Sequence, residues 1–87
     1  MIKNSTHHSN ILIVDDEADI RMLVGGILSD EGYAVRKAGD SEIAWTMITE
    51  KSPDLVLLDI WLEGSQLDGM DLLRKIKRVY PQISVIM

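Results

Sequence analysis

The stretch ILIVDD at residues 11–16 joins four aliphatic residues to two acids, and LVLLD at residues 55–59 repeats the pattern with one acid. Segments that are apolar at every position are typical of strands covered on both faces, as in a parallel sheet. The two stretches therefore predict two buried parallel strands, each of which ends in aspartate.

Three segments between the strands have apolar residues at helical spacing. The residues expected to face inward are Ile20, Leu23, Val24, Ile27 and Leu28 in the first, Ile43, Ala44, Met47 and Ile48 in the second, and Met70, Leu72, Leu73, Ile76 and Val79 in the third. Gly32 is expected to end the first helix, because glycine readily takes the left-handed conformation at a helix end. Asp40 or Ser41 and, later, Asp68 are candidate caps for the other two. Gly25 and Gly26, inside the first helix, suggest close packing against a neighbouring backbone.

Two further strands are expected at residues 34–38 and 83–87. Arg36 and Lys37 lie centrally in the former, and charges there are typical of a strand at a sheet edge. The order of elements is then βαβαβαβ. Alternating strands and helices with buried strands predict an α/β fold, a doubly wound parallel sheet with right-handed crossovers and helices on both faces.

Composition narrows the class of protein. The chain has 87 residues, enough for one small domain, with 46% hydrophobic and 26% charged residues. Its net charge of −5 argues against nucleic-acid binding, which needs clustered basic residues. No cysteine is present, and no apolar run approaches the roughly 18 residues that span a membrane. A polar start without a signal peptide makes the cytoplasm the expected compartment.

The acids that end the two buried strands are the candidate functional residues. Ligands of open α/β sheets bind beyond the carboxyl ends of the strands. If the two strands are neighbours, Asp15, Asp16 and Asp59 meet in one crevice, where their mutual repulsion favours a bound cation or protons. Oxygen ligands suit Mg²⁺ or Mn²⁺. A carboxylate beside such an ion is a competent nucleophile toward phosphorus. The alternative for any single acid, Asp16 and Asp68 above all, is a helix cap or a solvated loop residue.

These motifs resemble the receiver domains of two-component response regulators, which are CheY-like. The resemblance rests on ILIVDDE at residues 11–17, LVLLD at residues 55–59 and LDGMDLL at residues 67–73, and it covers the chain from Asn10 onward. It implies a flavodoxin-like fold for residues 10–87, preceded by a flexible tail at residues 1–9. It also implies that the chain is not itself an enzyme beyond self-dephosphorylation.

The resemblance also implies roles for individual residues. Asp59 would accept a phosphoryl group from a phosphohistidine on a sensor histidine kinase. Asp16 would bind Mg²⁺ directly, Asp15 mainly through water, and the backbone carbonyl of Trp61 would be a further ligand. The domain would control transcription through an output domain outside this sequence.

Two features depart from the usual receiver pattern. The position four residues after the acceptor, where most receivers have proline, is Glu63, and the loop to Asp68-Gly69 is about two residues longer. This loop resembles receivers of the NtrX type, found on nitrogen-related regulators. The second departure is length, because a whole receiver has five strands and five helices. A C-terminally truncated domain is therefore expected, with the fourth strand as an open edge and the first helix partly bare. We expect such a chain to self-associate through both surfaces.

Two other functions remain open. One is an interaction or dimerisation module that keeps the receiver shape without phosphorylation. The other is a Mg²⁺-dependent phosphohydrolase with an aspartyl nucleophile. Such enzymes usually carry a second acid two residues after the nucleophile, and neither Asp59 nor Asp15 is followed by that pattern.

Overall fold

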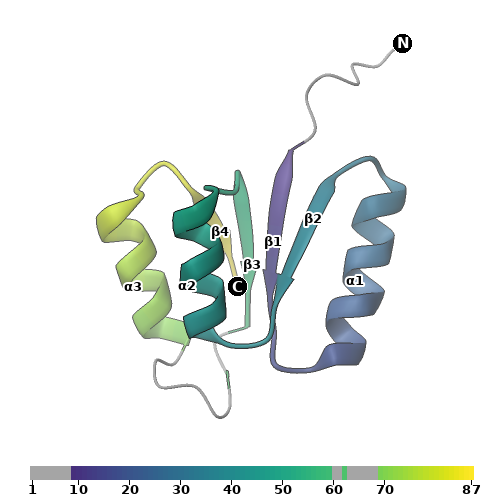
Figure 1. Cartoon of the computed structure of the whole chain (residues 1–87), viewed down its shortest axis with the longest axis horizontal. Coiled ribbons are helices and arrows are strands. Elements are labelled where there is room, and N and C mark those ends of the chain that lie inside the picture. The colour runs from purple at the N-terminus through teal and green to yellow at the C-terminus, as the bar shows by residue number, and fades with distance from the viewer. Residues whose placement is uncertain (1–8, 60–61, 63–68) are drawn as a thin grey trace.

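A single parallel sheet forms the centre of the molecule in the computed structural model, which describes residues 9–59, 62 and 69–87 (Figure 1). Its strands are β1 (Asn10–Val14), β2 (Ala34–Ala38), β3 (Leu55–Leu58) and β4 (Ser84–Ile86). They lie in the order β2-β1-β3-β4, and every neighbouring pair is parallel. The predicted parallel α/β fold is confirmed, with the charged strand β2 at one edge.

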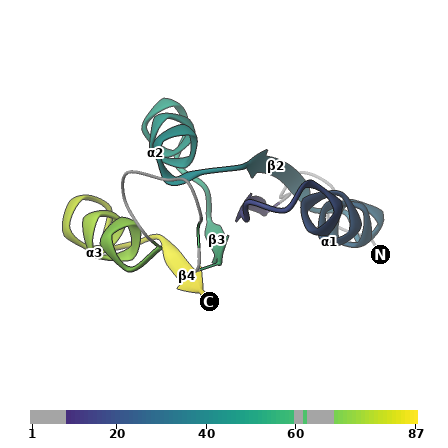
Figure 2. The ribbon, with the colours of Figure 1, turned by 90° about the horizontal axis from the view of Figure 1, so that it is seen from below.

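In the described part of the chain three helices connect the strands: α1 (Ala18–Asp30), α2 (Ser41–Glu50) and α3 (Gly69–Val79). Figure 2 shows α1 on one side of the sheet and α2 and α3 together on the other. This division follows from right-handed crossovers, since strand order reverses direction after β1 and moves the later helices to the opposite face.

The helix ends largely follow the sequence signals. Asp40 is the N-cap of α2, and its carboxylate accepts a hydrogen bond from the Ile43 N–H at 2.8 Å. Gly32 has a φ of +98°, the left-handed conformation expected just after α1. The N-cap of α1 is Glu17 rather than Asp16, and it makes no side-chain capping bond. The predicted cap Asp68 lies outside the described residues.

The core lies between the sheet and the pair α2 and α3. Its fully or almost fully buried residues include Leu12, Val14, Ala44, Ile48, Val56, Leu58, Leu72, Ile76 and Ile83. Leu55 and Leu57 of β3 point to the other face and are only half-buried. The prediction that this strand is fully covered on both faces is therefore wrong for the described residues, because α1 lies over β1 and β2 rather than over β3.

Several residues predicted to face inward from the helices are exposed. Leu23 and Ile27 of α1 are 60% and 56% exposed, and Ile20 is also exposed. In the other helices, Ile43, Met70 and Val79 are exposed too. The physical reason is that an apolar stripe wider than the contact it makes leaves its margins in solvent. For α1 this agrees with the expectation of a partly bare face.

The glycine pair of α1 has two different environments. A β-carbon at Gly25 would lie 2.8 Å from Cε of Lys37, whereas one at Gly26 would meet nothing within 4 Å. Gly25 is therefore closely packed, as expected, but against the side chains of β2 rather than a backbone. Gly26 is in open space.

We expect Gly26→Ala to stabilise the fold by up to about 1 kcal/mol, because glycine costs that much relative to alanine inside a helix. Gly25→Ala is the matched control and should gain less, since the end of the Lys37 side chain must move. The midpoint of urea unfolding measures both effects. A gain for Gly25→Ala as large as that for Gly26→Ala would contradict this assignment.

Candidate functional site

Three aspartates lie at the carboxyl ends of the two central strands. Asp15 and Asp16 directly follow β1, and Asp59 directly follows β3. The strands are paired with Val14 opposite Leu58, and the Asp59 N–H donates to the Val14 carbonyl at 2.9 Å. This register brings the ends of the strands level. The prediction of one shared crevice required these two strands to be neighbours, and in the structure they are.

The three carboxylates converge. One oxygen from each of Asp15, Asp16 and Asp59 can be chosen so that all lie within 4.8 Å of one another, and all three residues are half-buried. The charges are thus close together but not withdrawn from water. Asp15 is also held by its neighbours: its N–H donates to the Ala38 carbonyl at 3.1 Å, and its carboxylate accepts from the Glu17 N–H at 2.9 Å.

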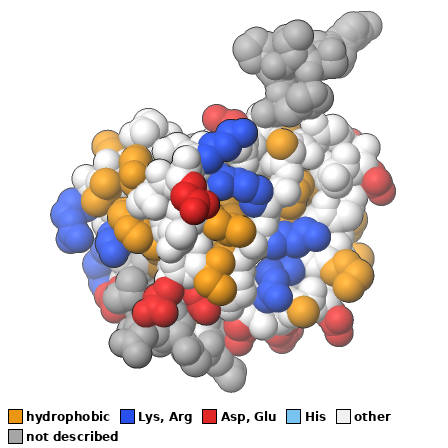
Figure 3. Space-filling view, viewed as in Figure 1, with side chains coloured by type: hydrophobic (Ala, Val, Ile, Leu, Met, Phe, Trp, Pro, Cys, Tyr) orange, Lys and Arg blue, Asp and Glu red, His pale blue; other side chains and the backbone are white. Residues whose placement is uncertain are grey.

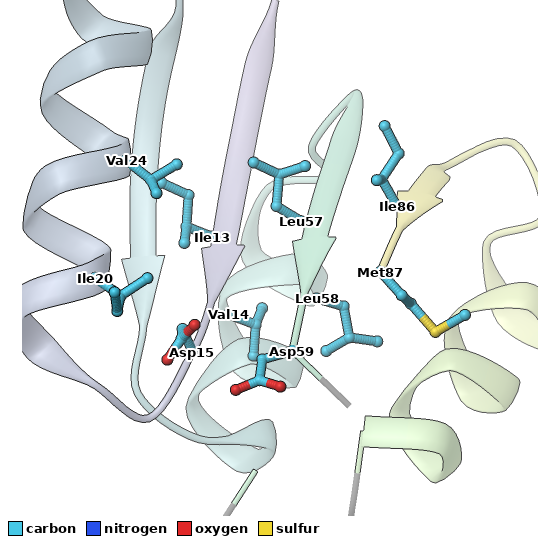
Figure 4. Close-up of a pocket in the computed structure, with 10 residues that line it drawn as sticks. All are labelled: Ile13, Val14, Asp15, Ile20, Val24, Leu57, Leu58, Asp59, Ile86 and Met87. Carbon is cyan, nitrogen blue, oxygen red and sulfur yellow. The ribbon is translucent and has the colours of Figure 1, made fainter. Parts of the chain in front are cut away.

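A hollow opens beside the acids. It has a volume of about 460 Å³, and Figure 4 shows Asp15 and Asp59 at one end of it. The rest of its wall is apolar and comes from β1, α1, β3 and the end of the chain: Ile13, Val14, Ile20, Val24, Leu57, Leu58, Ile86 and Met87. The acids therefore border both solvent and an apolar surface.

The acidic cluster fits a small hard cation. One oxygen from each acid lies within 4.8 Å of the others, a spacing that allows all three carboxylates to contact one hydrated ion, directly or through a bound water. Oxygen donors without sulfur or nitrogen favour Mg²⁺ or Mn²⁺ over softer metals. Side chains of Asp and Glu also gather along the lower edge of the molecule in Figure 3, the edge where the strands end.

One predicted ligand cannot be placed. Trp61 lies outside the described residues, as do Glu63 and the rest of the loop up to Asp68.

Arg21 is a residue near the site that the sequence reasoning did not single out. Its Nη1 donates to the Asp15 carbonyl at 2.5 Å. Its position one turn into α1, six residues after that aspartate, is the only signal that the sequence offers.

None of the helices in the described ranges is long and apolar enough to cross a membrane.

Comparisons with known proteins agree on the family. The response regulator receiver domain family matches residues 11–87. The nitrogen assimilation regulatory protein NtrX of Azorhizobium caulinodans is 55% identical over 78 residues, which are 90% of this chain and 17% of that protein. The chain thus spans about a sixth of the length of this relative.

Solved structures give the same result. The receiver domain of NtrX from Brucella abortus superposes with a TM-score of 0.86 at 56% identity, over 88% of this chain and 64% of that one. The response regulator TrrA of Thermotoga maritima, solved in complex with Mg²⁺-BeF, has a TM-score of 0.84 at 33% identity, over 91% of this chain and 67% of that one. With its parallel sheet, its acidic cluster and a family match that runs from Ile11 to Met87, this chain belongs to the response regulator receiver domains and is homologous to NtrX.

Proposed function

We propose that Asp59 is the phosphoacceptor of this receiver domain and that the donor is a phosphohistidine on a sensor histidine kinase. The observation that carries the proposal is the meeting of three carboxylates, from two separate strand ends, at the edge of an open hollow. Family membership supports the same assignment, because receiver domains take their phosphoryl group from histidine kinases.

The chemistry follows from the positions of the acids. A carboxylate oxygen of Asp59 attacks phosphorus in line, a P–O bond forms, and the P–N bond of the donor breaks. Its electron pair goes to the imidazole nitrogen, which takes a proton and leaves as histidine. The product is an acyl phosphate on Asp59. Attack of water on this phosphorus would restore the carboxylate and release phosphate, which is the self-dephosphorylation we propose.

A divalent cation, Mg²⁺ or Mn²⁺, would be held by Asp16, by Asp59 and, through water, by Asp15, with the Trp61 carbonyl as a further ligand. When bound, it neutralises the negative charge that the acids and the incoming phosphoryl group bring together. The strand ends of β1 and β3 hold the acids in place, so that the site need not be assembled at each transfer. The complex of TrrA with Mg²⁺-BeF supports this choice of metal.

Withdrawal of Mg²⁺ should abolish phosphorylation. With phosphoramidate as a small donor, intact-mass spectrometry should show the addition of one phosphoryl group when Mg²⁺ is present. An excess of EDTA should reduce labelling at least about a hundredfold, because the charge of three acids then repels the donor. Restored MgCl₂ should restore the label. Equal labelling with and without the ion would sink the metal-dependent mechanism.

Finer assignments rest on the same resemblance. We propose residues 10–87 as part of the receiver domain and residues 1–9 as a tail; of the tail only Ser9 is among the described residues. In the whole protein the domain would act in the cytoplasm and control transcription through an output domain, as the likeness to NtrX suggests. The phosphohydrolase and the phosphorylation-independent module are not favoured, because all three acids of the receiver pattern are present and converge.

We also propose that the 87-residue chain self-associates. Among the described strands, β4 pairs only with β3. Ile86, the last residue of β4, is 55% exposed, and Met87, which follows it, is 64% exposed. Exposed strand edges and apolar patches of this kind favour association, and the outer face of α1 adds Leu23 and Ile27. Light scattering should give a mass above 9.8 kDa that rises with concentration. A constant monomer mass over a hundredfold range would count against it.

A further inference from the structure

The geometry points to Arg21 as a positioning residue for the aspartate pair that follows β1, acting through the main chain of Asp15. The inference rests on the proposed metal-dependent phosphoacceptor site. Arg21 holds the peptide group between Asp15 and Asp16 through its bond to the Asp15 carbonyl.

The bond from Arg21 is short and charge-assisted. Nη1 lies 2.5 Å from the Asp15 carbonyl oxygen, and the contact is partly buried. Hydrogen bonds from an ionised donor are about twice as strong as neutral ones. Because a peptide unit is planar, a bond that holds the Asp15 carbonyl also fixes the direction in which the chain enters Asp16. The Cα atom of Asp16 lies in that plane, so the bond also helps to fix where the Asp16 side chain begins. That side chain reaches the acidic cluster.

Other groups of Asp15 are anchored from two further directions. The Asp15 N–H, which belongs to the preceding peptide, donates to the Ala38 carbonyl at the end of β2, and the Asp15 carboxylate accepts from the Glu17 N–H. Arg21 adds a restraint on the Asp15 carbonyl from a third element, α1.

Gly39 makes room for the guanidinium. A β-carbon at this position would lie 3.2 Å from Nη1 and 3.5 Å from Cζ of Arg21. Gly39 has no positive φ, so alanine would not strain the backbone there. Gly39→Ala should therefore shift the guanidinium by a few tenths of an ångström without removing it. This offers a second variant that perturbs the bond from the opposite side.

The sign of the effect separates positioning from a simple charge effect. Arg21 is a cation close to an acidic cluster, so its loss by itself would strengthen the binding of another cation. Loss of positioning has the opposite result, because scattered ligands bind a metal more weakly. Mutation of groups that orient metal ligands typically costs about 10–100-fold in affinity.

The test is to measure the Mg²⁺ affinity of the full 87-residue chain by isothermal titration calorimetry with MgCl₂. Arg21→Ala should weaken Mg²⁺ binding about tenfold, and Arg21→Lys, which keeps a cationic donor, should recover part of the loss. Gly39→Ala should weaken binding a few-fold in the parent and have no effect in the Arg21→Ala background. Gly26→Ala, on the open side of α1, is the matched control and should leave the affinity unchanged. Circular dichroism establishes that each variant is folded; if Arg21→Ala is not, Arg21→Lys and Gly39→Ala decide.

Unchanged or tighter Mg²⁺ binding in the folded Arg21 and Gly39 variants would overturn the positioning role and leave the proposed function intact. A parent chain that binds no Mg²⁺ would overturn the proposed function itself, and the positioning role with it. The two failures are thus distinguishable in one series of titrations.

Discussion

Asp59→Asn should remove the phosphoryl label from this chain completely. The amide nitrogen and oxygen that replace the carboxylate carry no negative charge, so the side chain is a poor nucleophile toward phosphorus. The substitution keeps the size of the side chain, and Asp59 is only half-buried, so the fold should persist. With phosphoramidate and Mg²⁺, labelling measured by intact mass should fall by a factor of at least about a thousand, a barrier increase of about 4 kcal/mol.

The matched control for this variant is Asp30→Asn, which makes the same chemical change at an exposed position at the end of α1. Its labelling should equal that of the parent. Tryptic mapping of the labelled parent should place the phosphoryl group on the peptide that contains Asp59. A label that survives in Asp59→Asn would show that another residue is the acceptor.

Leu12→Ala should have the largest effect on stability. Leu12 is fully buried in the middle of β1, between β2 and β3, and faces the core under α2 and α3. Truncation of a buried leucine costs about 3–5 kcal/mol, because it removes apolar contact and leaves a cavity. Small domains are stable by only about 5–15 kcal/mol. The loss should therefore lower the unfolding temperature by more than about 12 °C.

Leu23→Ala is the control with identical chemistry at a site on α1 that is 60% exposed. Its effect should stay within about 0.5 kcal/mol. Urea unfolding, monitored by the circular dichroism of the helices, compares the two variants. If Leu12→Ala and Leu23→Ala lowered the free energy of unfolding by similar amounts, Leu23 of α1 would have to be as deeply buried as the centre of the sheet.

Periodicity made the elements predictable. Continuous apolar runs at β1 and β3, and apolar residues three and four apart between them, are local signals that depend only on neighbours in the chain. Turn chemistry is equally local, and Asp40 and Gly32 take the expected positions at helix ends. The acids after β1 and β3 belong to the same class of signal, because a strand that ends in aspartate can be recognised without knowing its partner.

Burial was less predictable, because it depends on what the fold places opposite a residue. Leu23 and Leu72 look alike as members of helical stripes, yet Leu23 is mostly exposed and Leu72 is fully buried. The difference arises because α2 and α3 pack beside each other over the sheet, whereas α1 lies alone on its face among the described elements. An apolar stripe in the sequence shows that one face of a helix is apolar. How much of that face is buried depends on the surface that packs against it.

The chain's own residues thus specify three acids at strand ends, and the element order that makes a parallel sheet. Whether those acids form one site depends on β1 and β3 being neighbours in register, which brings one carboxylate oxygen of each of Asp15, Asp16 and Asp59 within 4.8 Å of the others. The same holds for Arg21 and Gly39, which meet only because α1 turns back over the end of β2. Local patterns are encoded by adjacent residues, but these contacts join residues 18 to 44 positions apart (from Arg21 to Gly39 and from Asp15 to Asp59). Only the pairing of strands and the docking of helices can bring such distant residues together.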